Sequence, residues 1–184
     1  MTEKKRRRQE ILVSAVHKEP FLTDEALAKK LAVSVQTVRR DRTELGIPEL
    51  RARVRTLAEH AREKVRAIPH TEVVGDLLSL DLGRCGTSAL KVTDDLLFAD
   101  LDIARGTALF SKANSLALAI IDAPVAMTGV ANVKYKVPIR KGDTVIARAE
   151  IVKVRGNKTF VWVKTYREDK EVFRAKFIVV SLEK

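Results

Sequence analysis

Residues 103–121 form a helix-length stretch whose second half, Ala113 to Ile121, is apolar on nearly every side. A helix that is apolar all round has to be buried over most of its surface. No apolar run in the chain reaches the roughly 18 to 20 residues that a membrane-spanning helix needs. The rest of the chain must therefore enclose this helix with other elements, in a soluble protein.

Strand-like segments stand on both sides of the predicted helix and are joined by turn residues. An enclosed helix wrapped by a long antiparallel sheet is the hotdog arrangement, which predicts an α+β fold. The segment from Tyr135 to Glu150 resembles the turn-and-strand signature of hotdog thioesterases, in which a proline and a Gly-Asp pair precede a long strand. The predicted strands are apolar-rich, alternating or β-branched and cover Val73 to Leu82, Ser88 to Val92, Val125 to Val137, Thr144 to Val154, Lys158 to Tyr166 and Glu171 to Leu182.

The first 47 residues predict a different, all-helical domain. Apolar spacing indicates a helix over residues 5–18, which Pro20 ends. Thr23 and Ser34 are placed as N-caps of two further helices, Asp24 to Leu31 and Ser34 to about Leu45, joined by a tight turn. A small shared core is expected from Leu27, Leu31, Val33, Val38 and Leu45.

Two short helices joined by a tight turn predict a helix-turn-helix that reads duplex DNA, and the run from Leu31 to Asp41 resembles that of DeoR-type bacterial regulators. Residues 1–69 hold 17 Lys and Arg against 10 Asp and Glu, whereas residues 70–184 hold 18 against 14. The basic excess at the N-terminal end favours a nucleic-acid partner over an ordinary solvated hairpin. The side chains expected to contact DNA are Ser34, Gln36, Thr37, Arg39, Arg40 and Arg42.

Residues 48–69 predict an amphipathic linker helix that ends at Pro69. Leu50, Val54, Leu57, Ala61 and Val65 give a narrow apolar stripe at helical spacing. An arginine row lies beside the stripe and consists of Arg51, Arg55, Arg62 and Arg66. We expect Arg51 and Arg55 to join the DNA contacts, with a plain surface linker as the alternative. The predicted domains are residues 1–47, 48–69 and 70–184.

The C-terminal part predicts ligand binding without catalysis, so no catalytic residue is expected. All three histidines lie at or before residue 70, and residues 103–121 contain no Asp or Glu to activate water. The single cysteine, Cys85, cannot form an intrachain disulfide or a cysteine metal cluster. Neither a metal nor a cofactor is expected. Arg105 near the start of the predicted helix could instead bind a carboxylate through two parallel hydrogen bonds.

Three strings, at residues 33–39, 42–51 and 103–122, together with the architecture, resemble the FapR family of bacterial repressors of fatty-acid and phospholipid synthesis genes. The resemblance implies a cytoplasmic homodimer that binds an inverted-repeat operator and is released by malonyl-CoA or malonyl-acyl carrier protein. It implies that Arg105 holds the malonyl carboxylate beside Gly106. It also implies that the pocket is completed by Phe98 and, from the partner chain, by Asn114, Ser115 and Leu116.

Arg105 and Asn114 are nine residues apart, so they face opposite ways on one ideal helix, which fits a pocket shared by two protomers. The structural alternatives are a salt bridge from Arg105 to Asp100 or Asp102 and a packing hydrogen bond for Asn114. Two other functions remain open at this stage. One is a hotdog acyl-CoA thioesterase with a basic appendage, and the other is a constitutive DNA-binding protein that uses its hotdog half only to dimerise.

Overall fold

The computed structural model describes residues 3–18 and 22–182. The chain separates into two compact units, Met1–Leu57 and Ala58–Lys184. The division falls inside helix α4 (Leu50–Glu63). The segment predicted as a linker, residues 48–69, therefore contributes to both units, and the three-part domain division stays a prediction.

The first unit contains the start of α4 and three complete helices: α1 (Glu3–Lys18), α2 (Asp24–Leu31) and α3 (Val35–Glu44). Both predicted N-caps are confirmed. The Ala26 amide donates to Thr23 Oγ1 at 3.1 Å, and the Thr37 amide donates to Ser34 Oγ at 3.2 Å. Ala32 ends α2 in the left-handed region at φ 52°. Pro20, predicted to stop the first helix, lies outside the described residues.

The core of the first unit contains most of the predicted side chains. Leu27 and Val38 are fully buried, and Leu31 and Val33 pack against them half-buried. Leu12 and Ala15 of α1 complete this core. The prediction for Leu45 is wrong, because α3 ends at Glu44 and the Leu45 side chain, 37% exposed, lines an open hollow beside α1.

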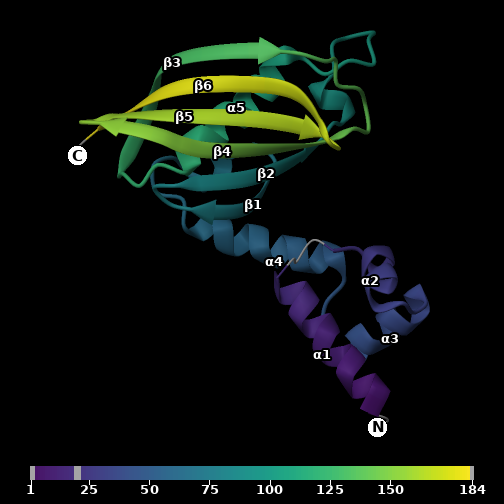
Figure 1. The fold of residues 1–184 in the computed structure, drawn as a ribbon. Helices are drawn as coiled ribbons and strands as arrows, with labels where there is room; N and C mark the ends of the chain where they lie inside the picture. The colour runs from purple at the N-terminus through teal and green to yellow at the C-terminus, as the bar shows by residue number, and fades with distance from the viewer. Residues whose placement is uncertain (1–2, 19–21, 183–184) are drawn as a thin grey trace. The chain divides into compact units, whose positions relative to one another are not determined.

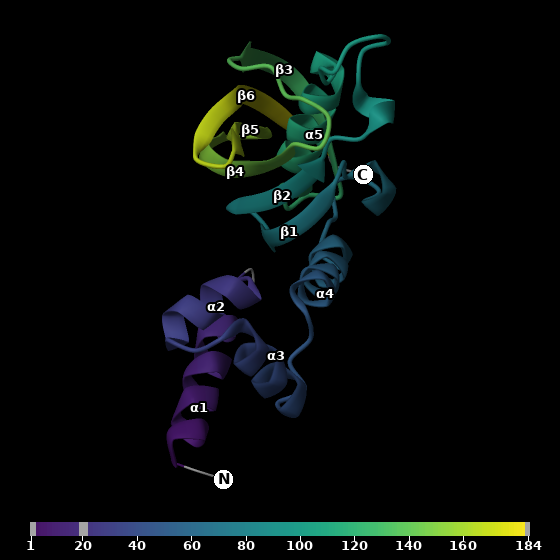
Figure 2. The same ribbon diagram turned by 90° about the vertical axis from the view of Figure 1, so that its right-hand side faces the viewer.

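The second unit is a six-stranded antiparallel sheet curled around one helix, as the hotdog prediction requires (Figures 1 and 2). The strands follow the order β1-β2-β4-β5-β6-β3, so β1 and β3 are the edges. Two short 3-10 helices, His70–Glu72 and Asp94–Leu96, lie in its loops. The strands are β1 (Asp76–Asp81), β2 (Cys85–Lys91), β3 (Val125–Tyr135), β4 (Thr144–Arg155), β5 (Lys158–Arg167) and β6 (Lys170–Leu182).

The enclosed helix, α5 (Gly106–Ala119), is buried along most of its length, and Ala113, Leu116 and Ala117 have no exposed surface. It begins three residues later than predicted. The amide of Ala104 donates to Ile139 at 2.8 Å and the amide of Arg105 donates to Leu96 at 2.8 Å. These contacts hold the segment before α5 extended, and none of them is visible in the helical periodicity of the sequence.

Helix α4 ends at Glu63 rather than near Pro69. Beyond it, Val65, Ala67 and Ile68 enter the hydrophobic core of the second unit together with Ala61. The later part of the predicted apolar stripe therefore packs within that unit. No helix of the described residues is long and apolar enough to span a membrane.

Candidate DNA-reading surface and effector pocket

The exposed face of α3 carries long polar side chains. Gln36, Arg39 and Arg40 are exposed, with 62% of the Arg39 side chain and 79% of the Arg40 side chain accessible. Arg39 forms an ion pair with Asp24 and Arg40 forms one with Glu44, each at 3.4 Å. The Arg40–Glu44 pair is exposed at both side chains, so it is weak and can be exchanged for a phosphate contact. These three side chains form the candidate DNA-reading surface.

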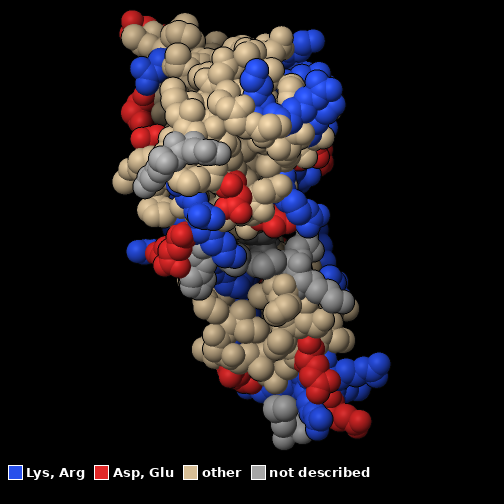
Figure 3. Space-filling view, turned by 90° about the vertical axis from the view of Figure 1, so that its left-hand side faces the viewer, with Lys and Arg blue, Asp and Glu red and all other residues tan. Residues whose placement is uncertain are grey.

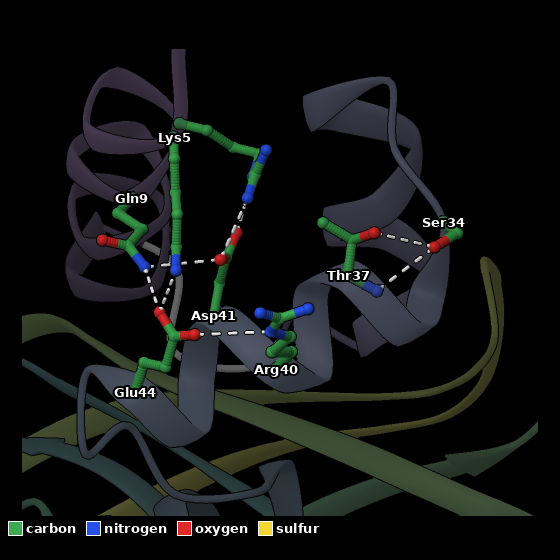
Figure 4. Close-up of polar contacts among 8 residues, drawn as sticks. Lys5, Gln9, Ser34, Thr37, Arg40, Asp41 and Glu44 are labelled. Carbon is green, nitrogen blue, oxygen red and sulfur yellow. Dashed lines mark hydrogen bonds and ion pairs between the residues drawn. The ribbon is translucent and has the colours of Figure 1, made fainter. Parts of the chain in front are cut away.

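Ser34 is the N-cap residue of α3, and Thr37 lies in its first turn. The Ser34 hydroxyl caps the helix and lies 2.9 Å from the Thr37 hydroxyl (Figure 4). Both side chains are thus fixed at the N-terminal end of α3, the end that reaches base edges in helix-turn-helix proteins.

Arg42 is the exception among the predicted DNA contacts. Only 7% of its side chain is exposed. Its guanidinium donates to Asp24 Oδ1 at 2.8 Å, to Asp24 Oδ2 at 3.0 Å and to the Ile47 carbonyl at 3.0 Å. The Arg42 guanidinium holds the pKa of Asp24 below its usual range. Arg42 therefore joins α2 to α3 and cannot reach DNA, because its donors are used in the interior.

A polar clamp between α1 and α3, not predicted from the sequence, positions the reading helix (Figure 4). Arg8 donates to the two oxygens of the buried Asp41 at 2.6 and 3.0 Å, and Gln9 donates to Asp41 at 3.3 Å and to Glu44 at 3.0 Å. Lys5 pairs with Glu44 at 2.6 Å. The hydrogen bonds from Arg8 hold the pKa of Asp41 below its usual range. Asp41 stands between two arginines of the predicted reading helix, and this is the sequence feature from which the clamp could have been predicted.

The arginine row of the predicted linker divides into two groups. Arg51 and Arg55 on α4 are exposed. Arg62 donates to the Gly75 carbonyl at 2.7 Å, and Arg66 pairs with Asp122 at 2.7 Å, so both are tied to the hotdog unit. Arg53, which the row omitted, is buried and donates to the carbonyls of Pro48 and Leu22 at 2.7 Å each.

A largely apolar pocket of about 390 Å³ lies at the start of α5. It brings together two predicted residues, Phe98 and Gly106. Its lining contains no Asp or Glu and consists of Phe98, Ile103, Ala104, Gly106, Leu109, Tyr135, Lys136, Val137, Pro138 and Ile139.

Arg105 is the N-cap residue of α5, between two residues that line this pocket. Its guanidinium donates to the Asp95 carbonyl. Among the described residues it forms no ion pair with Asp100 or Asp102. A carbon added at Gly106 would lie 3.2 Å from the Tyr135 ring, whose hydroxyl donates to the Gly106 carbonyl at 2.9 Å. Gly106 thus leaves room for Tyr135, a pocket residue that the sequence did not single out.

The three other predicted pocket residues point elsewhere within this chain. Asn114 Oδ1 accepts a hydrogen bond from Thr128 of β3 at 2.5 Å, so it faces that edge strand. Ser115 is buried, where it donates to the Lys112 carbonyl at 3.1 Å and accepts from the Val74 amide at 3.0 Å. Leu116 is fully buried against Gly86 of β2. Ser115 and Leu116 therefore lie in the interior of this chain, and their contribution to a pocket of the partner chain stays a prediction.

One lysine lies inside the hotdog core. Lys112 of α5 has no exposed surface, and its Nζ donates to the buried Ser88 Oγ at 2.8 Å. Burial lowers the pKa of Lys112 to about 7. In the described part of the chain, no three His, Cys, Asp or Glu side chains are grouped so as to hold a metal ion.

Two family models match the two parts of the chain. Residues 8–59 match the DeoR-like helix-turn-helix domain, and residues 96–173 match the thioesterase superfamily. Among solved structures, the chain resembles Cj0977, a sigma28-regulated virulence protein of Campylobacter jejuni. The TM-score is 0.65 at 20% identity, covering 70% of this chain and 92% of that one. This likeness shows the fold.

Curated relatives cover nearly the whole chain. The transcription factor FapR of Thermoanaerobacter sp. (strain X514) is 50% identical over 176 residues, which are 96% of this chain and 88% of that protein. The transcription factor FapR of Bacillus subtilis (strain 168) is 40% identical over 180 residues, with 96% of each chain covered. These relatives are transcription factors, so the hotdog unit here belongs to a regulator and not to an enzyme. The chain is a member of the FapR family of transcription factors.

Proposed function

We propose that this protein represses fatty-acid and phospholipid synthesis genes by binding an inverted-repeat operator as a homodimer in the cytoplasm. Malonyl-CoA or malonyl-acyl carrier protein releases it from DNA. Membership of the FapR family supports the DNA-binding half of the proposal. The exposed Gln36, Arg39 and Arg40 beside the Ser34 cap supply the reading face.

The observation that carries the effector half is Arg105 beside an apolar pocket that contains no acidic side chain. A guanidinium binds a carboxylate through two parallel charge-assisted hydrogen bonds. Malonyl-CoA has such a carboxylate and acetyl-CoA lacks it. Because a site prepared for a charged partner penalises an analogue without it, we expect acetyl-CoA to be rejected strongly.

Edge strand β3 supports the proposed homodimer. It is 11 residues long, and Met127 and Val130 on it are 58% and 54% exposed. A long uncovered edge strand is a template for pairing with another chain. Asn114 faces this edge through its bond to Thr128. Pairing of two β3 strands would therefore bring Asn114 toward the partner chain, which favours the expectation of a shared pocket.

The wild-type protein tests the proposal against the two alternatives. Operator duplexes are selected by the protein from a random-sequence pool, and the complexes are titrated with malonyl-CoA and with acetyl-CoA in a mobility-shift assay. We expect release by malonyl-CoA and retention with acetyl-CoA. Retention with both ligands would indicate a constitutive DNA-binding protein. A thiol-release assay on the same samples would reveal thioesterase turnover, which we expect to be absent.

A further inference from the structure

The outer face of the sheet, turned away from α5, carries a row of cations. Successive side chains of a strand point to opposite faces of the sheet. Val163 of β5 and Ala175 of β6 are buried on the inner face, so the residues directly before and after them point outward. Four adjacent strands each place one cation directly opposite the next in the pairing register. This basic row consists of Lys134 of β3, Arg174 of β6, Lys164 of β5 and Arg148 of β4.

Like charges directly opposite one another destabilise a sheet, so the basic row is costly to the fold. One carboxylate, Glu171, offsets part of the repulsion between these cations by accepting hydrogen bonds from Arg174 at 2.7 and 2.8 Å. Glu171 also pairs with Lys136 at 2.7 Å. Among the described residues, Lys134, Lys164 and Arg148 form no ion pair. The surplus positive charge of the row is thus left to solvent.

Two aromatic rings hold cations of this face in place. The Arg148 guanidinium carbon lies 5.6 Å from the centroid of the Tyr166 ring, and Lys176 Nζ lies 4.6 Å from that of Trp162. Such contacts fix the cations before any ligand arrives. They also cover ring faces on which nucleic-acid bases would have to stack. The face is therefore better suited to carboxylates than to single-stranded nucleic acid.

Two open hollows lie along the basic row. One, of about 340 Å³, is lined by Arg148, Lys164, the two aromatic rings, one carboxylate, Glu150, and Ala149 with residues 85–87 of β2. The other, of about 360 Å³, is lined by Asn132, Lys134, Arg174 and Lys176. Figure 3 shows Lys and Arg side chains gathered on the part of the surface formed by the hotdog unit, at the upper right.

The spacing of the basic row matches an α-helix laid across the strands. Neighbouring strands lie about 4.7–4.9 Å apart, and one helical turn rises about 5.4 Å. Acidic side chains repeated at every turn would therefore meet successive cations of the row. We propose that the basic row is a docking surface for an acidic α-helix of a partner protein. This surface uses neither the reading helix nor Arg105, so its test is independent of the proposed function.

The test uses the full-length protein and a labelled synthetic helical peptide with Glu at every turn along one face. A matched peptide has the same composition with the Glu distributed around the helix. We expect the first peptide to bind in fluorescence anisotropy, and the second to bind roughly tenfold more weakly. Lys164→Glu should abolish the preference. Lys158→Glu, the same charge change at an exposed position outside the row, should leave it intact.

Thermal unfolding distinguishes a loss of peptide binding from a loss of folding in Lys164→Glu. Lys164→Glu places a carboxylate opposite Arg148 and Arg174, so its Tm should equal or exceed that of the wild type. Equal binding of the two peptides would overturn the proposal, and so would an equal loss of peptide binding in Lys158→Glu and Lys164→Glu. Either result would show that binding depends on the net charge of the protein and not on the basic row. A single-stranded oligonucleotide that binds more tightly than the peptide and is lost in Lys164→Glu would also overturn it.

Discussion

The side chain of Lys112 shows how burial sets the charge of a single residue. Its folded-state pKa is lowered to about 7 by desolvation, whereas an unfolded lysine titrates near about 10.4. Between these values the unfolded chain binds a proton that the folded chain does not. Stability therefore rises with pH over this range, by at most about 1.4 kcal/mol per pH unit.

We expect Lys112→Met to remove this rise. Urea unfolding is followed by the fluorescence of Trp162, the single tryptophan of the chain, which lies in the hotdog sheet. The comparison runs from about pH 7 to about pH 9, below the usual pKa of the exposed lysines. Lys91→Met, at an exposed position, serves as the control and should keep the wild-type slope. Parallel pH profiles for wild type and Lys112→Met would contradict the assignment of a neutral buried amine.

Arg42 and Arg40, two residues apart on α3, should behave differently. Arg42→Ala leaves Asp24 without its main partner in a mostly buried site, which costs about 3 kcal/mol or more. Arg40→Ala removes an exposed ion pair and should change stability by less than about 1 kcal/mol. Hydrogen exchange of the α2 and α3 amides in the full-length protein measures both effects. Equal protection in the two variants would remove the structural role assigned to Arg42.

At the scale of elements, most helices and strands were predictable because their residues follow clear periodicities. The six strands agree with the prediction to within a few residues at their ends. The end of α4 was predicted less well, since the helix ends at Glu63 and not near Pro69, and α5 begins three residues later than predicted. Both boundaries depend on contacts between distant segments, such as Ala104 with Ile139 and Val65 with the hotdog core. Spacing along one segment carries no information about such contacts.

Among the site residues too, features that depend on local sequence were predictable and features that depend on contacts between distant segments were not. Ser34 was predictable as a cap because N-capping is local. The burial of Arg42 was not predictable, since a helical surface pattern does not reveal that Asp24 of the preceding helix lies opposite it. The role of Tyr135 beside Gly106 was missed for the same reason, because the two residues are 29 positions apart.

Helix α4 gives a prediction about DNA binding at this scale. Arg51 is exposed, whereas Arg62 donates to the Gly75 carbonyl. Each neutralised phosphate contributes about 0.9 to the slope of log affinity against log salt. In the proposed homodimer Arg51→Ala removes one phosphate contact from each protomer, so we expect it to reduce that slope by about 1.8 and Arg62→Ala to leave it unchanged. Equal slopes for Arg51→Ala and wild type would make α4 a structural connector without a phosphate contact from Arg51.

At the scale of the whole molecule, a ligand can release DNA only if it binds one conformation of the protein more tightly than another. The proposed difference arises at the hotdog pocket, whereas the side chains proposed to read the operator, Gln36, Arg39 and Arg40, belong to the first unit. The two activities should therefore separate genetically. A variant that loses ligand recognition should keep its DNA affinity and become a permanent repressor.

Titration of malonyl-CoA into preformed operator complexes of wild type and Arg105→Ala tests this account most directly. Arg105 lies outside the first unit, and the hydrogen bond that its side chain makes among the described residues goes to the Asp95 carbonyl. Its removal should therefore leave both operator affinity and thermal stability unchanged. We expect the wild-type complex to dissociate and the Arg105→Ala complex to persist at the same malonyl-CoA concentrations. Dissociation of the Arg105→Ala complex at the wild-type concentration would show that Arg105 does not recognise the effector.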